Sequence, residues 1–132
     1  MTTKPDFTKL FDIAIKARDN ASAKYSKFKV GAAILTKSGN IYSGSNVESS
    51  SYGLSICAER VALFTALTNG EKEFDSILLV SDSSSPTSPC GACRQVLYDY
   101  APNINVIMSN LNKDEVVENI KNLLIKPFSL DK

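Results

Sequence analysis

Pro89-Cys90-Gly91-Ala92-Cys93 stands where a polar loop gives way to a helical pattern. Cysteines three residues apart at a helix start place both sulfurs on one face, and proline suits the entry of a helix but not its interior. The third cysteine of the chain lies upstream, in Cys57-Ala58-Glu59-Arg60, which also opens a helical pattern. The two stretches therefore predict two helix starts that converge on one site.

The three cysteines predict a metal centre. A structural zinc site is closed by four protein ligands, whereas a catalytic site keeps three and leaves one position for water or substrate. The chain has no histidine, so Cys57, Cys90 and Cys93 match the catalytic pattern. Glu59 can take up and pass on the proton of an activated water. The alternatives are buried apolar cysteines or a Cys-x-x-Cys redox pair, and neither accounts for both stretches.

The charge of such a centre needs an offset. Three thiolates around Zn²⁺ leave a net charge of about −1, which weakens the metal as a Lewis acid. Two of the three arginines in the chain, Arg60 and Arg94, lie beside the cysteines. We expect their guanidinium groups to donate to the sulfurs and withdraw negative charge, the alternative being ordinary surface charges.

Length and composition indicate one soluble domain over residues 1–132. Lys+Arg 15 against Asp+Glu 14 gives a net charge of +1, which disfavours nucleic acid as the main partner. The apolar runs are too short for a membrane helix, and the first residues do not resemble a secretory signal. An odd number of cysteines without such a signal is typical of the reducing cytoplasm.

Hydrophobic periodicity predicts a sheet covered by helices. The expected order is α-β-β-α-β-α-β-β, and the segment at 45–55 is expected to be a binding loop. The second helix has a serine start signal at Ser55 and a glycine at its end. The expected elements are helices at 8–20, 55–69 and 90–100, a hairpin of strands at 30–35 and 41–44, and strands at 76–81, 106–108 and 116–120.

These residues resemble the zinc-dependent nucleoside and nucleotide deaminases, whose signature is His- or Cys-x-Glu followed by Pro-Cys-x-x-Cys. Cysteine as the first ligand separates this branch from the deoxycytidylate and nucleic-acid deaminases. The chain is most similar in pattern to the small homotetrameric cytidine deaminases, with which it shares residues 25–33, 44–48, 51–60 and 88–95.

The resemblance implies a three-layer α/β/α fold, with a central mixed five-stranded sheet and helices on both faces. It implies one Zn²⁺ per chain and the hydrolytic deamination of cytidine and 2′-deoxycytidine to uridine and 2′-deoxyuridine, with release of ammonia, in pyrimidine salvage. It also implies a homotetramer in which neighbouring subunits complete each site.

The resemblance also implies roles for single residues. Asn46 and Glu48 would bind the ribose hydroxyls, and an amide and a carboxylate two apart on an extended segment do point the same way. Phe28 would pack on the pyrimidine, although core packing is an equally good explanation of a phenylalanine there. The backbone of Ala58 would bind the base carbonyl, while Glu59 would hold N3 and carry the proton.

Two further residues are implied by the family's contacts between subunits. The family usually ends in Leu-Leu-Pro-x-x-Phe, whose phenylalanine reaches a neighbouring site. Here the segment is Leu123-Leu124-Ile125-Lys126-Pro127-Phe128, so the proline has moved two places while Phe128 keeps its spacing. Tyr52 corresponds to a loop that packs across subunits.

Three other functions remain as alternatives. The first is a deaminase of another aminopyrimidine nucleoside, although Asn46 and Glu48 favour a ribose or deoxyribose. The second is a zinc-stabilised interaction domain without catalysis, which calls for a fourth ligand and gives Glu59 no task. The third is a nucleic-acid editing deaminase, which calls for an open groove and a basic surface.

Overall fold

The computed structural model describes residues 7–130, which form five strands, four α-helices and one short 3-10 turn. In chain order these are α1 (Thr8–Asp19), β1 (Val30–Thr36), β2 (Ile41–Ser45), η1 (Tyr52–Leu54), α2 (Ala58–Thr68), β3 (Phe74–Ser81), α3 (Gly91–Tyr100), β4 (Asn105–Ser109), β5 (Glu115–Asn119) and α4 (Ile120–Leu123).

The strands form one mixed sheet in the order β2-β1-β3-β4-β5. β3 and β4 run parallel, and the other neighbouring pairs are antiparallel. Parallel neighbours need a crossover connection, and α3 lies in it. The start of α3, which carries two of the cysteines, therefore follows the end of the central strand β3. The five-stranded mixed sheet with its helices confirms the fold expected from the sequence.

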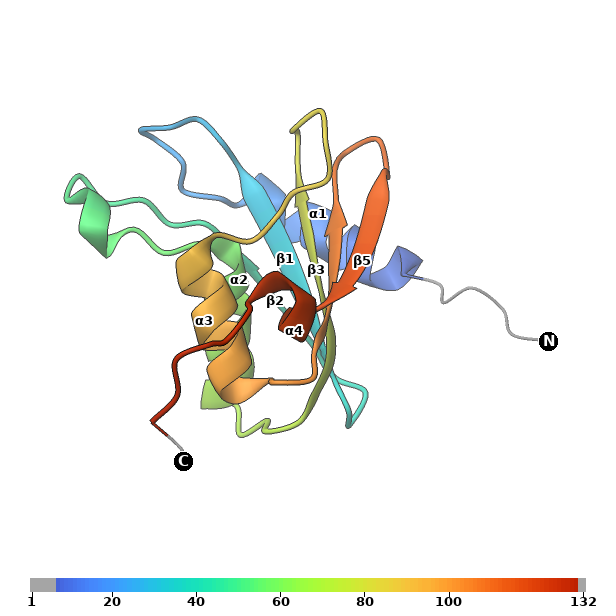
Figure 1. The fold of residues 1–132 in the computed structure, drawn as a ribbon. Helices are drawn as coiled ribbons and strands as arrows, with labels where there is room; N and C mark the ends of the chain where they lie inside the picture. The colour runs from blue at the N-terminus through green and yellow to red at the C-terminus, as the bar shows by residue number, and fades with distance from the viewer. Residues whose placement is uncertain (1–6, 131–132) are drawn as a thin grey trace.

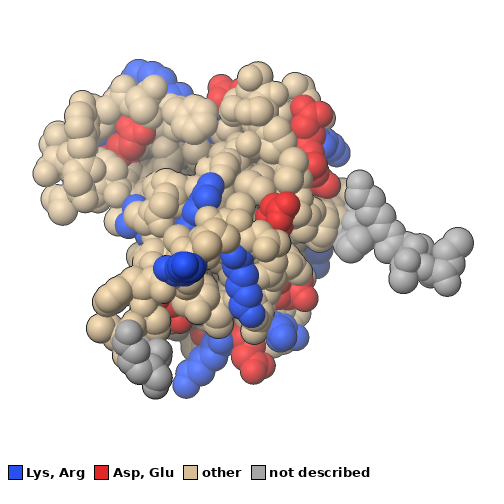
Figure 2. Space-filling model, in the orientation of Figure 1, with Lys and Arg blue, Asp and Glu red and all other residues tan. Residues whose placement is uncertain are grey.

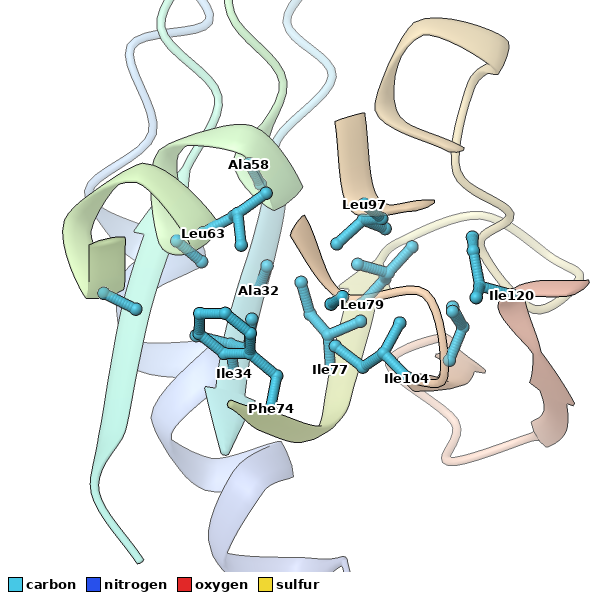
Figure 3. Packing of buried hydrophobic residues seen from close by; sticks show 14 of the residues in the cluster. Ala32, Ile34, Ala58, Leu63, Phe74, Ile77, Leu79, Leu97, Ile104 and Ile120 are labelled. Carbon is cyan, nitrogen blue, oxygen red and sulfur yellow. The ribbon is translucent and has the colours of Figure 1, made fainter. Parts of the chain in front are cut away.

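Helices cover the sheet on both faces, as Figure 1 shows: α1 lies on one side, and α2 and α3 lie on the other. Because side chains alternate along a strand, β1 contributes Ala32 and Ile34 to the core under α2 and α3, and Ala33 to the core under α1. Figure 3 shows the larger core, where Leu63 of α2 and Leu97 of α3 meet side chains of the sheet.

Two glycines allow helices to lie directly on the strands. A Cβ atom at Gly44 in β2 would lie 2.4 Å from the backbone nitrogen of Ala62 and 2.7 Å from the carbonyl oxygen of Ala58. A Cβ atom at Gly31 in β1 would lie 2.0 Å from the carbonyl oxygen of Ala14 in α1. Gly44 thus fixes how closely the first turn of α2 approaches the end of the hairpin.

The elements expected from periodicity are present, with two corrections. The last strand ends one residue earlier than expected, and Ile120 begins α4, a helix that periodicity did not predict. α2 begins at Ala58, with Cys57 as its N-cap, and not at the serine start signal of Ser55. The Ser55 hydroxyl oxygen instead accepts a hydrogen bond from the Ser49 backbone N–H at 3.0 Å. Serine favours turns as well as helix starts, so the signal marks the closure of the loop that contains η1.

Charges are mixed over the visible surface. Figure 2 shows basic and acidic side chains interspersed on the face that it presents, in keeping with the net charge of +1. Within residues 7–130, no helix has the length and apolar character needed to cross a membrane.

Candidate metal centre

The three cysteines meet where α2 and α3 begin. Cys57 and Cys90 are the N-cap residues of the two helices, and Cys93 lies in the first turn of α3. The Sγ atoms of Cys57 and Cys90 are 3.7 Å apart, and those of Cys90 and Cys93 are 3.4 Å apart. All three sulfurs lie within 4.8 Å of one another. The predicted convergence of the two helix starts is therefore present.

The sulfur positions fit a zinc ion. A tetrahedral ion with Zn–S bonds of about 2.3 Å holds its sulfurs about 3.8 Å apart, close to the two separations between cysteines. Cys93 is buried, Cys57 is half-buried and Cys90 is exposed, so the cluster opens to solvent on one side. The donor set is three thiols at two helix N-termini, where the helix dipoles favour negative charge.

The thiols restrain one another's ionisation. A hydrogen bond from Cys93, together with one from the Arg60 guanidinium, lowers the pKa of Cys57 to about 5. The pKa of Cys93 is raised, because its thiol is committed to Cys57 and is buried beside negative charge. Ionisation of one thiol therefore disfavours ionisation of the next. A bound cation is what would allow all three sulfurs to be thiolates together.

Glu59 lies beside this cluster in the first turn of α2. Its side chain is 5% exposed, a burial that capping of the helix start alone would not require. Burial raises the pKa of Glu59 to about 7, and the negative charge of Cys57 adds to the effect. A carboxyl group with a pKa near neutrality can both accept and return a proton.

The two arginines beside the cysteines have different partners. Arg60 donates from Nη2 to the Cys57 sulfur at 3.8 Å, as the charge argument expects. The hydrogen bonds of Arg94 go instead to oxygen atoms, namely the carbonyls of Pro89 and Leu123, both at 2.8 Å, and the hydroxyl of Ser88 at 2.7 Å. The structure therefore corrects the expectation that Arg94 donates to a ligand sulfur. Its guanidinium instead links the segment before Cys90 to the end of α4.

The segment with the expected sugar-binding residues lies beside the cysteine cluster. Val47 and Ile56 exchange two backbone hydrogen bonds, of 3.0 and 2.9 Å, which places residues 46–48 next to the stretch that leads into Cys57. The Phe28 side chain is 43% exposed, so it is not a core residue. Ala58 is fully buried as the first residue of α2, and the N–H groups of a first turn have no partner within the helix.

Tyr52 and Phe128 lie apart from the cysteines. Tyr52 lies in η1 and is 76% exposed. Its ring lies edge-on to the ring of Tyr25, with 6.4 Å between the two ring centroids. Phe128 is 68% exposed and lines a cavity of about 520 Å³ with Tyr98 and Tyr100, towards the C-terminal end of α3. Neither residue is brought to the cysteine cluster of its own chain.

Two contacts of the site were not anticipated from the sequence. Gly44 sets how closely α2 approaches β2, and the position of Gly44 two residues before Asn46 does not indicate this contact. Gln95 follows Arg94 in α3 and donates to the carbonyl oxygen of Phe128 at 2.9 Å. Both contacts join residues far apart in the chain, so periodicity carries no signal for them.

Comparison with known proteins agrees with this geometry. Residues 5–109 match the family of the cytidine and deoxycytidylate deaminase zinc-binding region. The chain is 42% identical over 125 residues to the cytidine deaminase of Sporosarcina psychrophila, covering 94% of this chain and 92% of the relative. It is 43% identical over 119 residues to the cytidine deaminase of Halalkalibacterium halodurans, covering 89% and 90%.

A solved structure has the same fold. The cytidine deaminase from Burkholderia pseudomallei superposes with a TM-score of 0.91 at 43% identity, covering 94% of this chain and 100% of that one. The shared fold and the cysteine cluster define a zinc-binding deaminase domain. The chain belongs to the cytidine and deoxycytidylate deaminase family.

Proposed function

We propose that this protein is a zinc-dependent cytidine deaminase that converts cytidine and 2′-deoxycytidine to uridine and 2′-deoxyuridine, with release of ammonia, in cytoplasmic pyrimidine salvage. The observation that carries the proposal is the buried carboxyl of Glu59 beside three converging cysteine sulfurs. One Zn²⁺ per chain would be held by Cys57, Cys90 and Cys93. The high identity to cytidine deaminases over almost the whole chain supports the substrate.

The chemistry assigns a separate task to each group. When bound, zinc supplies a Lewis acid that lowers the pKa of a water molecule. Glu59 would take one proton from the water that attacks C4 and deliver it to N3, and would then move the second proton of the same oxygen to the departing amino group. The base loses ammonia and gains the oxygen of water. Arg60 offsets the surplus negative charge through its hydrogen bond to Cys57.

Binding of the nucleoside would use the residues that surround the cluster. Phe28 would pack on the pyrimidine, and the Ala58 backbone N–H would donate to its carbonyl oxygen. Asn46 and Glu48 would bind the sugar hydroxyls from the strand end beside Ile56. Arg94 would act indirectly, by holding the Pro89 carbonyl and so the segment that enters Cys90.

The proposal is tested by following the ultraviolet absorbance change of cytidine deamination, together with the zinc content, for wild type and Glu59→Gln. We expect about one zinc per chain in both proteins, and a loss of about 10²- to 10⁴-fold in kcat for the variant. Wild type with zinc but no activity on cytidine or 2′-deoxycytidine would refute the proposal. Turnover of another aminopyrimidine nucleoside instead would leave a deaminase with a different substrate, and no turnover at all would favour a zinc-stabilised interaction domain.

We also propose that the active form is a homotetramer with sites completed by neighbouring subunits. Tyr52, Leu54, Phe128 and Leu130 are exposed apolar side chains, and a contact between subunits would bury them. Light scattering on the purified protein should give four chains. Mixed oligomers of Glu59→Gln and Phe128→Ala subunits should be more active than either variant alone, whereas a strict sum of the two activities would show that Phe128 serves only its own chain.

A further inference from the structure

The loop that enters β1 is held by the carboxylate of Glu48. One oxygen of Glu48, Oε1, accepts the backbone N–H groups of Tyr25 and Ser26, each at 3.0 Å. The other oxygen, Oε2, accepts the hydroxyl of Ser26. The Ser26 hydroxyl oxygen in turn accepts the backbone N–H of Phe28 at 3.0 Å. Ser26 therefore lies between the expected sugar-binding carboxylate and the aromatic residue expected to contact the base.

Asn46 holds the same loop from the other side. Its Oδ1 accepts the backbone N–H of Val30 at 2.9 Å, and its Nδ2 donates to the carbonyl oxygen of Phe28 at 2.8 Å. Both backbone polar groups of Phe28 are thus fixed by side chains. Lys27, between Ser26 and Phe28, has a φ of 63°, a left-handed conformation that is costly for a residue other than glycine. The hydrogen bonds around it maintain this turn.

The number of acceptor sites on Glu48 limits what the carboxylate can still bind. An ionised carboxylate offers about four lone-pair sites, two on each oxygen. The loop occupies both sites of Oε1 and one site of Oε2. The remaining site is on Oε2, the same oxygen that accepts the Ser26 hydroxyl. The side chains of Glu48 and Ser26 line a groove of about 340 Å³, together with Tyr25, Tyr52 and Ser55.

We propose that Ser26 is a positioning residue for sugar recognition, which orients Oε2 of Glu48 towards a hydroxyl of the nucleoside and ties that carboxylate to the backbone of Phe28. The inference rests on the proposed function. The Ser26 hydroxyl is also the main cause of the lowered pKa of Glu48. This hydrogen bond therefore favours the ionised, acceptor-only form of Glu48, which is the form that can accept from a sugar hydroxyl.

The test compares ligands that differ only in their sugar hydroxyls. With cytidine turnover as the assay, the inhibition constants of uridine and 2′,3′-dideoxyuridine are measured for wild type and Ser26→Ala. The ratio of the two constants reports recognition of the hydroxyls. We expect this ratio to fall about 10-fold in Ser26→Ala, the value of one hydrogen bond to a charged group. Equal weakening of both ligands would overturn the proposal, because a merely structural role affects both alike.

Two further variants and one control complete the experiment. Ser26→Thr keeps the hydroxyl and should restore most of the wild-type ratio, and Ser26→Cys, a weaker donor, should give an intermediate ratio even if Ser26→Ala folds poorly. A wild-type ratio in Ser26→Cys together with a low one in Ser26→Thr would contradict the proposal. The matched control is Ser38→Ala, another exposed serine that donates to a glutamate, here Oε1 of Glu71 at 3.1 Å, and it should leave the ratio unchanged. Wild type inactive on cytidine would instead refute the proposed function.

Discussion

A hydrogen-bonded carboxylate lies at each end of the β1–β2 hairpin. At the end nearest the metal centre, Glu48 accepts from two backbone N–H groups and the Ser26 hydroxyl. At the turn, Glu71 accepts from three side chains, Ser38 at 3.1 Å, Asn40 at 2.8 Å and Tyr42 at 2.9 Å. Hydrogen bonds lower the pKa of both glutamates, so the two clusters are alike in local chemistry.

The clusters differ in what lies beside them. Glu48 follows Val47, whose backbone pairs with Ile56 next to Cys57 of the cysteine cluster. Glu71 lies between the end of α2 and the start of β3, where β1 pairs with β3 through Thr36 and Phe74. We therefore expect the same kind of carboxylate to serve the site at one end and only the turn at the other. On the proposed function, location in the fold, and not the residue type or its hydrogen-bond donors, would separate the functional glutamate from the structural one.

Removal of the metal should have the largest effect, and the two ends of the β1–β2 hairpin should respond to it differently. We expect a chelator to abolish activity and stoichiometric zinc to restore it, because the thiol cluster loses the cation that holds it together. Amide hydrogen exchange measured by mass spectrometry should increase at residues 55–61 and 88–95, but not at 36–42 and 70–74. A uniform increase over the chain would show that the metal supports the whole fold equally.

Gly44→Ala should have the next largest effect. The new Cβ atom would lie 2.4 Å from the Ala62 nitrogen, so the first turn of α2 must move, and a displacement of about 1 Å can cost about 10²-fold in rate. Steady-state kinetics and urea unfolding measure activity and stability separately.

Gly31→Ala is the matched control for Gly44→Ala. It forces a similar clash, with Ala14 of α1 at 2.0 Å, on the face without the metal ligands. Overpacking costs about 1–3 kcal/mol, so we expect both variants to be destabilised and Gly44→Ala to lose far more activity. Equal losses of activity would contradict the positioning role of Gly44.

Glu71→Gln should have the smallest effect, on stability alone. The Asn40 amide is the first cause of the lowered pKa of Glu71, followed by the Tyr42 hydroxyl. A lowered pKa in the folded state contributes stability above the unfolded value of about 4.3. This contribution is lost as pH falls through the folded pKa. The difference in urea midpoint between wild type and Glu71→Gln should therefore be constant near neutral pH and shrink in acid; growth of the difference in acid would contradict this account.

The sequence predicted those features that depend on local pattern. The hairpin follows from a short apolar run and the turn at Ser38-Gly39-Asn40, and the clustering of the three cysteines follows from their two short motifs. Pro89 also marked the start of α3 correctly, with Cys90 as the N-cap. Each of these signals lies within a few residues of the element that it predicts.

Other features depend on contacts across the fold. Arg94 lies beside a ligand in the sequence, yet it donates to Leu123, 29 positions away. Ser26 looks like any loop serine until the fold places it against Glu48. Ser55 has the residue type of a helix cap but closes a loop. Small polar side chains have several partners of similar energy, so tertiary structure decides among them.

The most direct test of the comparison is kcat/KM for cytidine in Glu48→Gln and Glu71→Gln, purified and measured side by side. We predict a loss of about 10- to 100-fold for Glu48→Gln, the value of a hydrogen bond to a charged group. We predict a change within about twofold for Glu71→Gln, because distant sites act independently. Equal losses, or a larger loss for Glu71→Gln, would contradict the assignment of one carboxylate to the site and the other to the turn.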